Sequence, residues 1–363
     1  MYELIINDCV NLSCNNQGFV FSPIFCVNPT ACAELCLISA PVLVAGYAEG
    51  VSVRLMNLSI MASETRETPS VIAKQLDKNQ EAVSQLVASL KQINPHLIYI
   101  IGRGSSDHAG VFGKYLFETQ MGIPVCSAAL SIAGIFGSQL QLKGAVAFVI
   151  SQSGRSPDIL NQARSAKQGG AFTVAFVNDE TSPLAELADA VIPLSAGEEK
   201  AVAATKSFMA TLSALLHVCA TWSGNAELHE GLKQLPAQLD KVIASPMQLS
   251  KAYLENMRNT VVLGRGFGYA VGREVALKLK EVLGIHAEAF SSAEFIHGPV
   301  TLVENKPDKK VKLIALNVHD ESASFHDDMV QNVKARGAEC IDLGIAMDNV
   351  HPRLSALLLM QRF

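Results

Sequence analysis

The sequence has little charge, few aromatic residues and no lysine or arginine before Arg54. Charged residues make up 17% of its 363 positions and aromatic residues 6%, and the formal net charge is -5. Because basic residues are not in excess, we expect no nucleic-acid partner and no anionic lipid surface as a partner. A secretory signal needs a basic region ahead of its apolar stretch, and residues 1–53 contain none. We therefore expect a cytoplasmic protein.

Long apolar runs and paired metal-binding cysteines are also lacking. The longest early apolar run, Leu35–Ala48, is too short to span a bilayer and contains Pro41, so no membrane segment is expected. No CxxC pair occurs, which argues against a zinc site, and scattered thiols fit a reducing compartment. Five of the eight cysteines lie in the first tenth of the chain: Cys9, Cys14, Cys26, Cys32 and Cys36.

The composition changes near Met61 and divides the chain. Residues 1–60 are rich in cysteine, lack lysine and show no sustained period. We expect them to be an extension outside the fold, either upstream of a true start at Met61 or a species-specific tail. The remaining chain is expected to form a first domain over 61–235 and a second over 236–363. An entry helix is predicted to begin with Thr68 as N-cap and Pro69 as its first residue.

Short apolar runs alternate with helical stretches through the rest of the chain, which predicts parallel strands joined by helices. Gly102-Arg103-Gly104 and Gly264-Arg265-Gly266 each follow a first strand, which indicates an internal duplication. The expected fold is α/β, with two tandem units that are each a three-layer sandwich around a parallel sheet. The predicted strands are Leu97–Ile101, Ala145–Ile150, Phe172–Val177, Ala190–Leu194, Thr260–Leu263, His286–Phe290, Leu313–Val318 and Cys340–Leu343.

A serine-rich loop follows one predicted strand and precedes a predicted helix. Ser151-Gln152-Ser153-Gly154-Arg155-Ser156 lies where the strand's carboxyl end and the helix N-terminus offer hydroxyls and backbone N–H groups to an anion. Taken alone, such a loop is also typical of a simple helix cap. Gly104-Ser105-Ser106 follows the preceding strand and should reach the same edge of the sheet. Together the two loops favour a phosphate site.

Acid–base residues lie on a predicted helix over Ala270–Leu283 and in a nearby turn. Glu274, Lys278 and Glu281 share one helix face, where they could be a solvated ion pair or a base and a cation for sugar isomerisation. His297 could be a hydrogen-bonded structural residue or a proton shuttle. The spacing alone leaves both alternatives open.

The motifs, in this order, resemble double SIS (sugar isomerase) domain proteins over nearly all of residues 61–363. The chain is similar to the isomerase half of glucosamine-6-phosphate synthase and, more closely, to stand-alone SIS-type glucosamine-6-phosphate deaminases. The motifs that carry the resemblance are GRGSSDHAG, SQSGRSPD, GEEKAVAATKSF, GRGFGYA and SSAEFIHGP.

The resemblance implies a set of site residues. Glu281 would move a proton between sugar carbons, Lys278 would stabilise the enediolate, and His297 would open the sugar ring from the partner subunit of a homodimer. Ser105 lies in the first loop beside the phosphate-binding residues. The resemblance assigns phosphate binding to Ser106, Ser151, Gln152, Ser153 and Ser156, and the sugar pocket to Val202 and Ala204.

The implied activity is deamination of glucosamine 6-phosphate to fructose 6-phosphate and ammonia, with no cofactor and no metal. Deamination is favoured over synthesis because residues 1–60 are too short for a glutaminase domain and Arg155 stands where the synthase loop has Glu. The resemblance also implies a helix and a lysine-containing tail beyond Phe363. Other possibilities are an isomerase or deaminase for galactosamine or tagatose phosphates, a fructosamine-phosphate deglycase, and a non-catalytic phosphosugar-binding regulator. Residues 1–60 show no basic helix-turn-helix pattern, which argues against the regulator.

Overall fold

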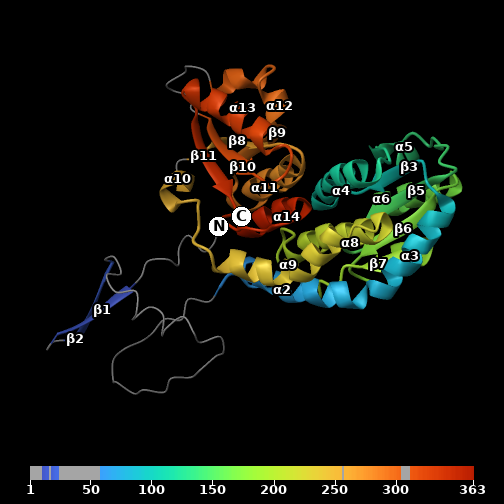
Figure 1. The fold of residues 1–363 in the computed structure, drawn as a ribbon, viewed down its shortest axis with the longest axis horizontal. Coiled ribbons are helices and arrows are strands. Elements are labelled where there is room, and N and C mark those ends of the chain that lie inside the picture. The colour runs from blue at the N-terminus through green and yellow to red at the C-terminus, as the bar shows by residue number, and fades with distance from the viewer. Residues whose placement is uncertain (1–9, 16–17, 24–57, 256, 304–310) are drawn as a thin grey trace. The chain divides into compact units, whose positions relative to one another are not determined.

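The computed structural model describes residues 10–15, 18–23, 58–255, 257–303 and 311–363 (Figure 1). The chain divides into two compact units, Met1–Ser59 and Ile60–Phe363. In the first unit, strands β1 (Val10–Asn15) and β2 (Gly18–Pro23) pair in antiparallel fashion. Most of the predicted extension 1–60 lies outside the described residues, so its assignment stays a prediction.

The first sheet of the second unit has five parallel strands in the order β4-β3-β5-β6-β7. In chain order this is 2-1-3-4-5, which reverses direction between β3 and β5 and places the ligand crevice of such folds there. Four strands were predicted; β4 was missed because it is short and has one buried residue. The strands are β3 (Leu97–Ile101), β4 (Val125–Ser127), β5 (Ala145–Ile150), β6 (Phe172–Val177) and β7 (Ala190–Pro193).

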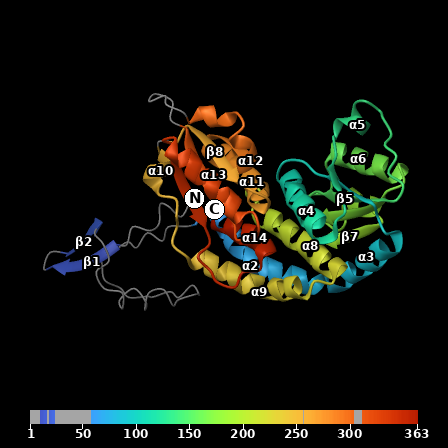
Figure 2. The ribbon, with the colours of Figure 1, turned by 45° about the horizontal axis from the view of Figure 1, so that its top comes forward.

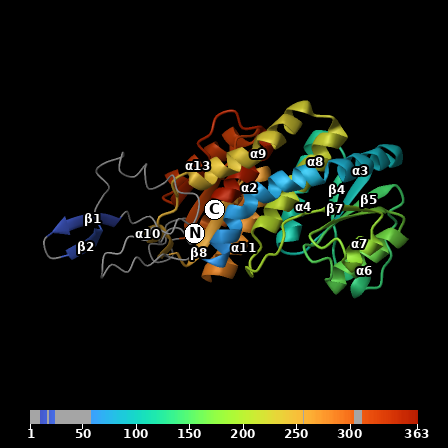
Figure 3. The ribbon, with the colours of Figure 1, turned by 90° about the horizontal axis from the view of Figure 1, so that it is seen from below.

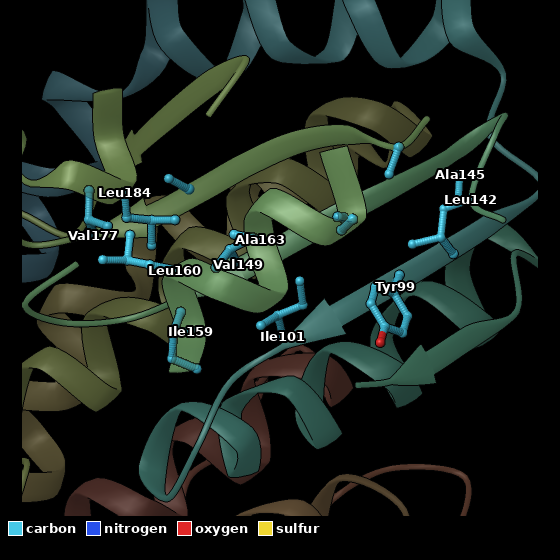
Figure 4. Packing of buried hydrophobic residues seen from close by; sticks show 14 residues of the cluster. Tyr99, Ile101, Leu142, Ala145, Val149, Ile159, Leu160, Ala163, Val177 and Leu184 are labelled. Carbon is cyan, nitrogen blue, oxygen red and sulfur yellow. The ribbon is translucent and has the colours of Figure 1, made fainter. Parts of the chain in front are cut away.

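Alternate residues of the central strands pack against helices on the two faces of this sheet. Figure 4 shows Ile101 and Val149 on one face, against Ile159 and Ala163 of α6 (Pro157–Gln168). Helix α4 (Ser105–Met121) covers the other face, where the Phe117 and Phe148 ring centroids are 5.3 Å apart. The two faces explain why the strands read as continuous apolar runs. The smaller helices are α5 (Ser131–Gly134) and α7 (Pro183–Leu187).

Among the described residues, the second sheet repeats this topology with four strands. Its four parallel strands have the order β11-β10-β8-β9, which in chain order is again 2-1-3-4 read from the other edge. Gly104 and Gly266, which precede the first helix of each repeat, have nearly the same dihedrals, φ 57° and ψ −128° against φ 52° and ψ −123°. The predicted duplication is therefore confirmed. The strands are β8 (Asn259–Gly264), β9 (His286–Ser291), β10 (Lys312–Asn317) and β11 (Glu339–Gly344).

Helices cover both faces of the second sheet as well, so each repeat is a three-layer αβα sandwich. Helix α11 (Phe267–Leu283) follows β8, and α13 (Ala323–Ala335) packs on the opposite face through Met329 and Val333. All eight predicted strands are observed with bounds within one residue. The other elements here are α10 (Lys251–Glu255), α12 (Ser292–Phe295), the 3-10 helix η2 (Pro299–Leu302) and α14 (Pro352–Arg362).

A layer of long helices contacts the first sandwich, and one of these helices, α9 (Ala226–Ala244), also packs against α14. Helix α2 (Ile60–Lys78) packs beside α8 (Lys206–Ser223) and α9, while α3 (Gln80–Ile93) packs on α8 (Figure 2 and Figure 3). The predicted domain boundary at residues 235/236 lies inside α9, and the division stays a prediction. Within the described residues, no helix is long and apolar enough to cross a membrane.

The predicted start of the entry helix was wrong. Thr68 is not an N-cap: it is fully buried, and α2 begins eight residues earlier, at Ile60, with Pro69 inside the helix. Proline has no N–H to donate to the carbonyl four residues before it, which normally breaks a helix. Here the side-chain amide of Gln361 donates to the Thr65 carbonyl at 3.0 Å and replaces the missing bond. A contact 296 residues away along the chain thus permits a continuous helix.

We expect His217, on α8, to make folding stability depend on pH. The side chain is 8% exposed, and burial, with a smaller effect of His229, lowers its pKa from 6.5 to about 4. The unfolded chain therefore binds more protons at His217 than the folded chain does between pH 4 and 6.5. The free energy of unfolding is therefore unaffected by His217 above pH 6.5 and falls as the pH drops toward 4. The expected loss is roughly 3 kcal/mol. Urea unfolding of wild type and His217→Gln across this pH window measures the loss. If the free energy of unfolding changed with pH equally in both proteins, the prediction would be contradicted.

Candidate functional site

The serine-rich loop lies at the carboxyl end of β5, ahead of α6. Ser151 is buried, and its Oγ accepts the Gly154 N–H at 3.2 Å, which closes a tight turn. Gly154 has φ 61°, and a Cβ there would lie 2.2 Å from the Ser182 Oγ, so no other residue fits without displacement. Pro157 starts the helix immediately after the loop, which aims the helix N-terminus at the crevice.

The two predicted loops reach the same edge of the sheet. Strands β3 and β5 are direct neighbours, with Ile101 opposite Val149. Arg103 Nε, in the turn after β3, donates to Asp158 Oδ2 at 2.7 Å, on the first turn of α6 after the serine-rich loop. Ser105 and Ser106 form the first turn of α4, whose N-terminus therefore faces the same crevice. The expected convergence is confirmed, while phosphate binding by these residues stays a prediction.

A second arginine–aspartate pair lies at the rim of the loop. The Arg155 guanidinium contacts the Asp179 carboxylate at 2.7 Å. Hydrogen bonds from Thr181 and then from Arg155 lower the pKa of Asp179 to about 2, so it stays ionised at neutral pH. Arg155 is thus held by a carboxylate and keeps a compensated charge beside the crevice.

Helix α11 presents a buried cation between two carboxylates. Lys278 is 3% exposed, and its Nζ lies 2.9 Å from Glu274 Oε1 and 3.0 Å from Glu281 Oε2. Glu274 is fully buried, whereas the Glu281 side chain is 40% exposed. The alternative of a solvated surface ion pair is therefore wrong for Glu274 and Lys278. The arrangement provides a desolvated ammonium next to a carboxylate that a ligand can reach.

Glu274 is kept ionised by its partners. Burial by itself would raise its pKa, but the hydrogen bond with His108 and the charge of Lys278 outweigh burial, so the pKa lies below its usual value. Ser105 Oγ also donates to Glu274 Oε1 at 2.8 Å, and Lys278 Nζ lies 3.4 Å from Ser105 Oγ. Through Ser105, the acid–base group on α11 contacts the first turn of α4, which also carries Ser106.

The predicted sugar-pocket loop is shaped by two glutamates that sequence reasoning did not assign. The Glu64 carboxylate of α2 is buried and accepts the backbone N–H groups of Lys200 and Ala201. Glu199 accepts the backbone N–H of Thr205 at 3.0 Å, just ahead of α8. With the backbone held in this way, the loop presents Val202 fully exposed and Ala204 partly exposed. Their contact with a sugar stays a prediction.

His297 is not part of the cluster on α11. It is exposed in the turn between α12 and η2, where its backbone N–H donates to the Glu294 carbonyl at 3.0 Å. In the part of the chain that the structure describes, no hydrogen bond or ion pair joins its side chain to Lys278 or Glu281. The approach of His297 from a partner subunit stays a prediction.

His108 was also missed by sequence reasoning. Its Nδ1 lies 2.8 Å from Glu274 Oε2, although the two residues are 166 positions apart. The only available signal was its place in GRGSSDHAG, on the first turn of a helix after a strand. Over residues 58–255, 257–303 and 311–363, no group of three or more His, Cys, Asp or Glu side chains is arranged to hold a metal ion.

Comparisons with known proteins find related sequences and folds. A family model described as SIS domain matches residues 93–219 and 253–352. A glutamine–fructose-6-phosphate aminotransferase [isomerizing] of Bradyrhizobium diazoefficiens is 33% identical over 299 residues, covering 77% of this chain and 48% of that relative. The corresponding aminotransferase of Clostridium acetobutylicum is 35% identical over 267 residues, covering 69% of this chain and 42% of the relative. The chain thus spans about half the length of these curated relatives or less.

Solved structures show the same fold. A putative phosphosugar isomerase from Silicibacter pomeroyi is 31% identical, with a TM-score of 0.78, covering 84% of this chain and 95% of that one. A glucosamine-6-phosphate deaminase from Thermotoga maritima is 23% identical, with a TM-score of 0.65, covering 84% of this chain and 91% of that one. The second likeness concerns the fold alone.

Proposed function

Because the chain belongs to the SIS domain family, we propose that it is a phosphosugar enzyme that converts glucosamine 6-phosphate to fructose 6-phosphate and ammonia. The observation that carries this proposal is the buried Lys278 between Glu274 and the accessible Glu281, in contact with the turn that follows β3. A cation next to a reachable base is what proton transfer beside a carbonyl requires. The similarity of its motifs to those of stand-alone SIS-type deaminases favours ammonia release.

In the proposed reaction the phosphate is held at the crevice between the carboxyl ends of β3 and β5, and the sugar chain extends toward α11. Hydroxyls of Ser106, Ser151, Ser153 and Ser156, together with the N-termini of α4 and α6, supply hydrogen bonds to the phosphate. Gln152 adds a side-chain amide. Because Arg155 is paired with Asp179, these neutral donors hold the phosphate. Such a site suits a chain without an excess of basic residues.

Glu281 then takes the proton from C2 of the open-chain amino sugar and returns it to C1. The Lys278 ammonium stabilises the negative charge that develops on the C1 oxygen. That oxygen then gains a proton and the C2 amine loses one, so the enolamine becomes a C2 imine beside a C1 hydroxyl. Water adds to C2 and ammonia leaves, so glucosamine 6-phosphate and water yield fructose 6-phosphate and ammonia. His297 of a second copy would promote ring opening, which makes a homodimer the proposed active form. These steps need side chains and water only.

A second candidate is aldose–ketose isomerisation of a phosphosugar without loss of ammonia. The similarity to the putative phosphosugar isomerase from Silicibacter pomeroyi, 31% identical, favours it. The same Glu281 and Lys278 would serve, since both reactions begin with proton transfer from C2 to C1. They differ in whether C2 carries an amine or a hydroxyl.

We expect the purified chain to release ammonia from glucosamine 6-phosphate. A coupled ammonia assay measures the release, with galactosamine 6-phosphate and fructosamine 6-phosphate tested in parallel and unphosphorylated glucosamine as the control. Formation of fructose 6-phosphate in equal amount completes the balance. Ammonia from none of the amino sugars would overturn the deaminase proposal, and interconversion of a phosphosugar in the same samples would then support the isomerase.

A further inference from the structure

The first turn of α4 fixes both oxygens of the buried Glu274 carboxylate. Ser105 Oγ contacts Oε1 at 2.8 Å, and His108 Nδ1 contacts Oε2 at 2.8 Å. Lys278 Nζ, at 2.9 Å, shares Oε1. Glu274 is fully buried and the His108 side chain is 12% exposed, so little water is present to replace either contact. The carboxylate therefore has a single orientation, set from a helix of the other repeat.

The Oε2 contact decides where the Lys278 ammonium rests. Without His108, Oε2 would be a buried acceptor with no partner among the described residues, which is costly for a charged group. The carboxylate would then rotate or shift to recover a partner, and Lys278 would follow it because the two are directly paired. Its Nζ would leave the position 3.0 Å from Glu281 Oε2.

We propose that His108 is a positioning residue that acts through Glu274 to hold the Lys278 ammonium beside Glu281. The effect on turnover rests on the proposed function, whereas the effect on Lys278 itself does not. Ser106, two residues before His108 on the first turn of α4, is proposed to hold phosphate, so one helical turn links the phosphate crevice to the acid–base pair. A shift of this turn on ligand binding would be passed to Lys278 directly.

A purely structural role at the contact between α4 and α11 is the alternative. Asp107 offers a matched control. It lies on the same turn of α4 as His108, and its carboxylate contacts Arg273 of α11, the helix that carries Glu274, at 3.1 Å. Asp107→Asn weakens the contact between the two helices without touching Glu274. His108→Leu removes the Oε2 partner. His108→Asn is the conservative variant, because its amide nitrogen is attached to Cγ as Nδ1 is.

The test measures two quantities on wild type and these three variants, after circular dichroism has shown that each is folded. The first is the rate at which acetic anhydride labels Lys278, followed by peptide mass spectrometry. We expect labelling roughly tenfold or more faster in His108→Leu, the factor for one hydrogen bond to a charged group. The second is kcat and KM for ammonia release, where kcat should fall about tenfold to a hundredfold with KM nearly unchanged.

His108→Asn should recover most of the wild-type protection of Lys278 and most of kcat, and Asp107→Asn should resemble wild type in both. Unchanged labelling in His108→Leu, or equal acceleration in Asp107→Asn, would overturn the positioning role. If wild type released no ammonia but labelling responded as expected, the proposed function would fail while the role of His108 stood. If His108→Leu did not fold, His108→Ala, which also removes the Oε2 partner, would be compared with Asp107→Asn by labelling. Faster labelling in His108→Ala alone is the expected result, and equal labelling in the two variants would overturn the positioning role.

Discussion

Replacing Glu281 with Gln is expected to lower kcat by about 10²- to 10⁴-fold, the usual contribution of a positioned general base. The Glu281 carboxylate lies 3.0 Å from Lys278 Nζ and is the exposed member of the cluster, so it is the group that a bound sugar can reach. An amide keeps the size and one oxygen acceptor for Lys278 but cannot take up the C2 proton. KM should therefore change little.

The measurement is steady-state ammonia release, with substrate binding followed separately by calorimetry. Glu288→Gln, an exposed carboxylate on β9, is the control for a general effect of charge removal. Retained binding with lost turnover is the expected result. Unchanged kcat in Glu281→Gln would remove Glu281 from the proposed proton transfer.

Replacing Lys278 with Met is expected to destabilise the protein by about 3–5 kcal/mol, the cost of breaking a buried ion pair from one side. Lys278 is 3% exposed and Glu274 is fully buried, so the substitution leaves a carboxylate in the interior without its cation. Combining Lys278→Met with Glu274→Gln should recover a large part of the loss, because the remaining group is neutral. Both variants should lose turnover.

Urea unfolding at neutral pH measures both effects. The matched control is Lys233→Met on α9, whose partner Glu230 is 3.3 Å away on the surface with both side chains more than half exposed. Such pairs contribute about 1 kcal/mol or less. Equal losses for Lys278→Met and Lys233→Met would contradict the role of burial, and so would a double variant as unstable as Lys278→Met.

The strands were predicted closely because each is a short apolar run bounded by turn residues. Ala145–Ile150 is buried along its whole length, so its six residues are apolar without alternation. The missed strand β4 has three residues, of which only Val125 is buried, and leaves no such run. Where the first helix begins was mispredicted because Thr68 and Pro69 form a strong local start signal. Tertiary contacts of Glu64 and Gln361 override that signal.

The candidate site was predictable to different degrees. The convergence of the loops after β3 and β5 followed from the rule that neighbouring parallel strands end at one edge, and the structure agrees. The contacts of Glu274 with Ser105 and His108 could not be predicted, since they join segments more than 160 positions apart. Nothing in the local pattern of α11 distinguishes this buried carboxylate from a surface one.

The amino-acid sequence by itself determined the α/β duplication and the place of the Ser151–Ser156 loop, because periodicity and turn chemistry act over a few residues. Only the tertiary structure decided that Lys278 and Glu274 are desolvated, that Glu281 stays accessible, and that residues of α4 contact Glu274. The physical reason is that burial and pairing depend on which distant surfaces meet. A helix carries the same residues whether its charged face meets water or another helix.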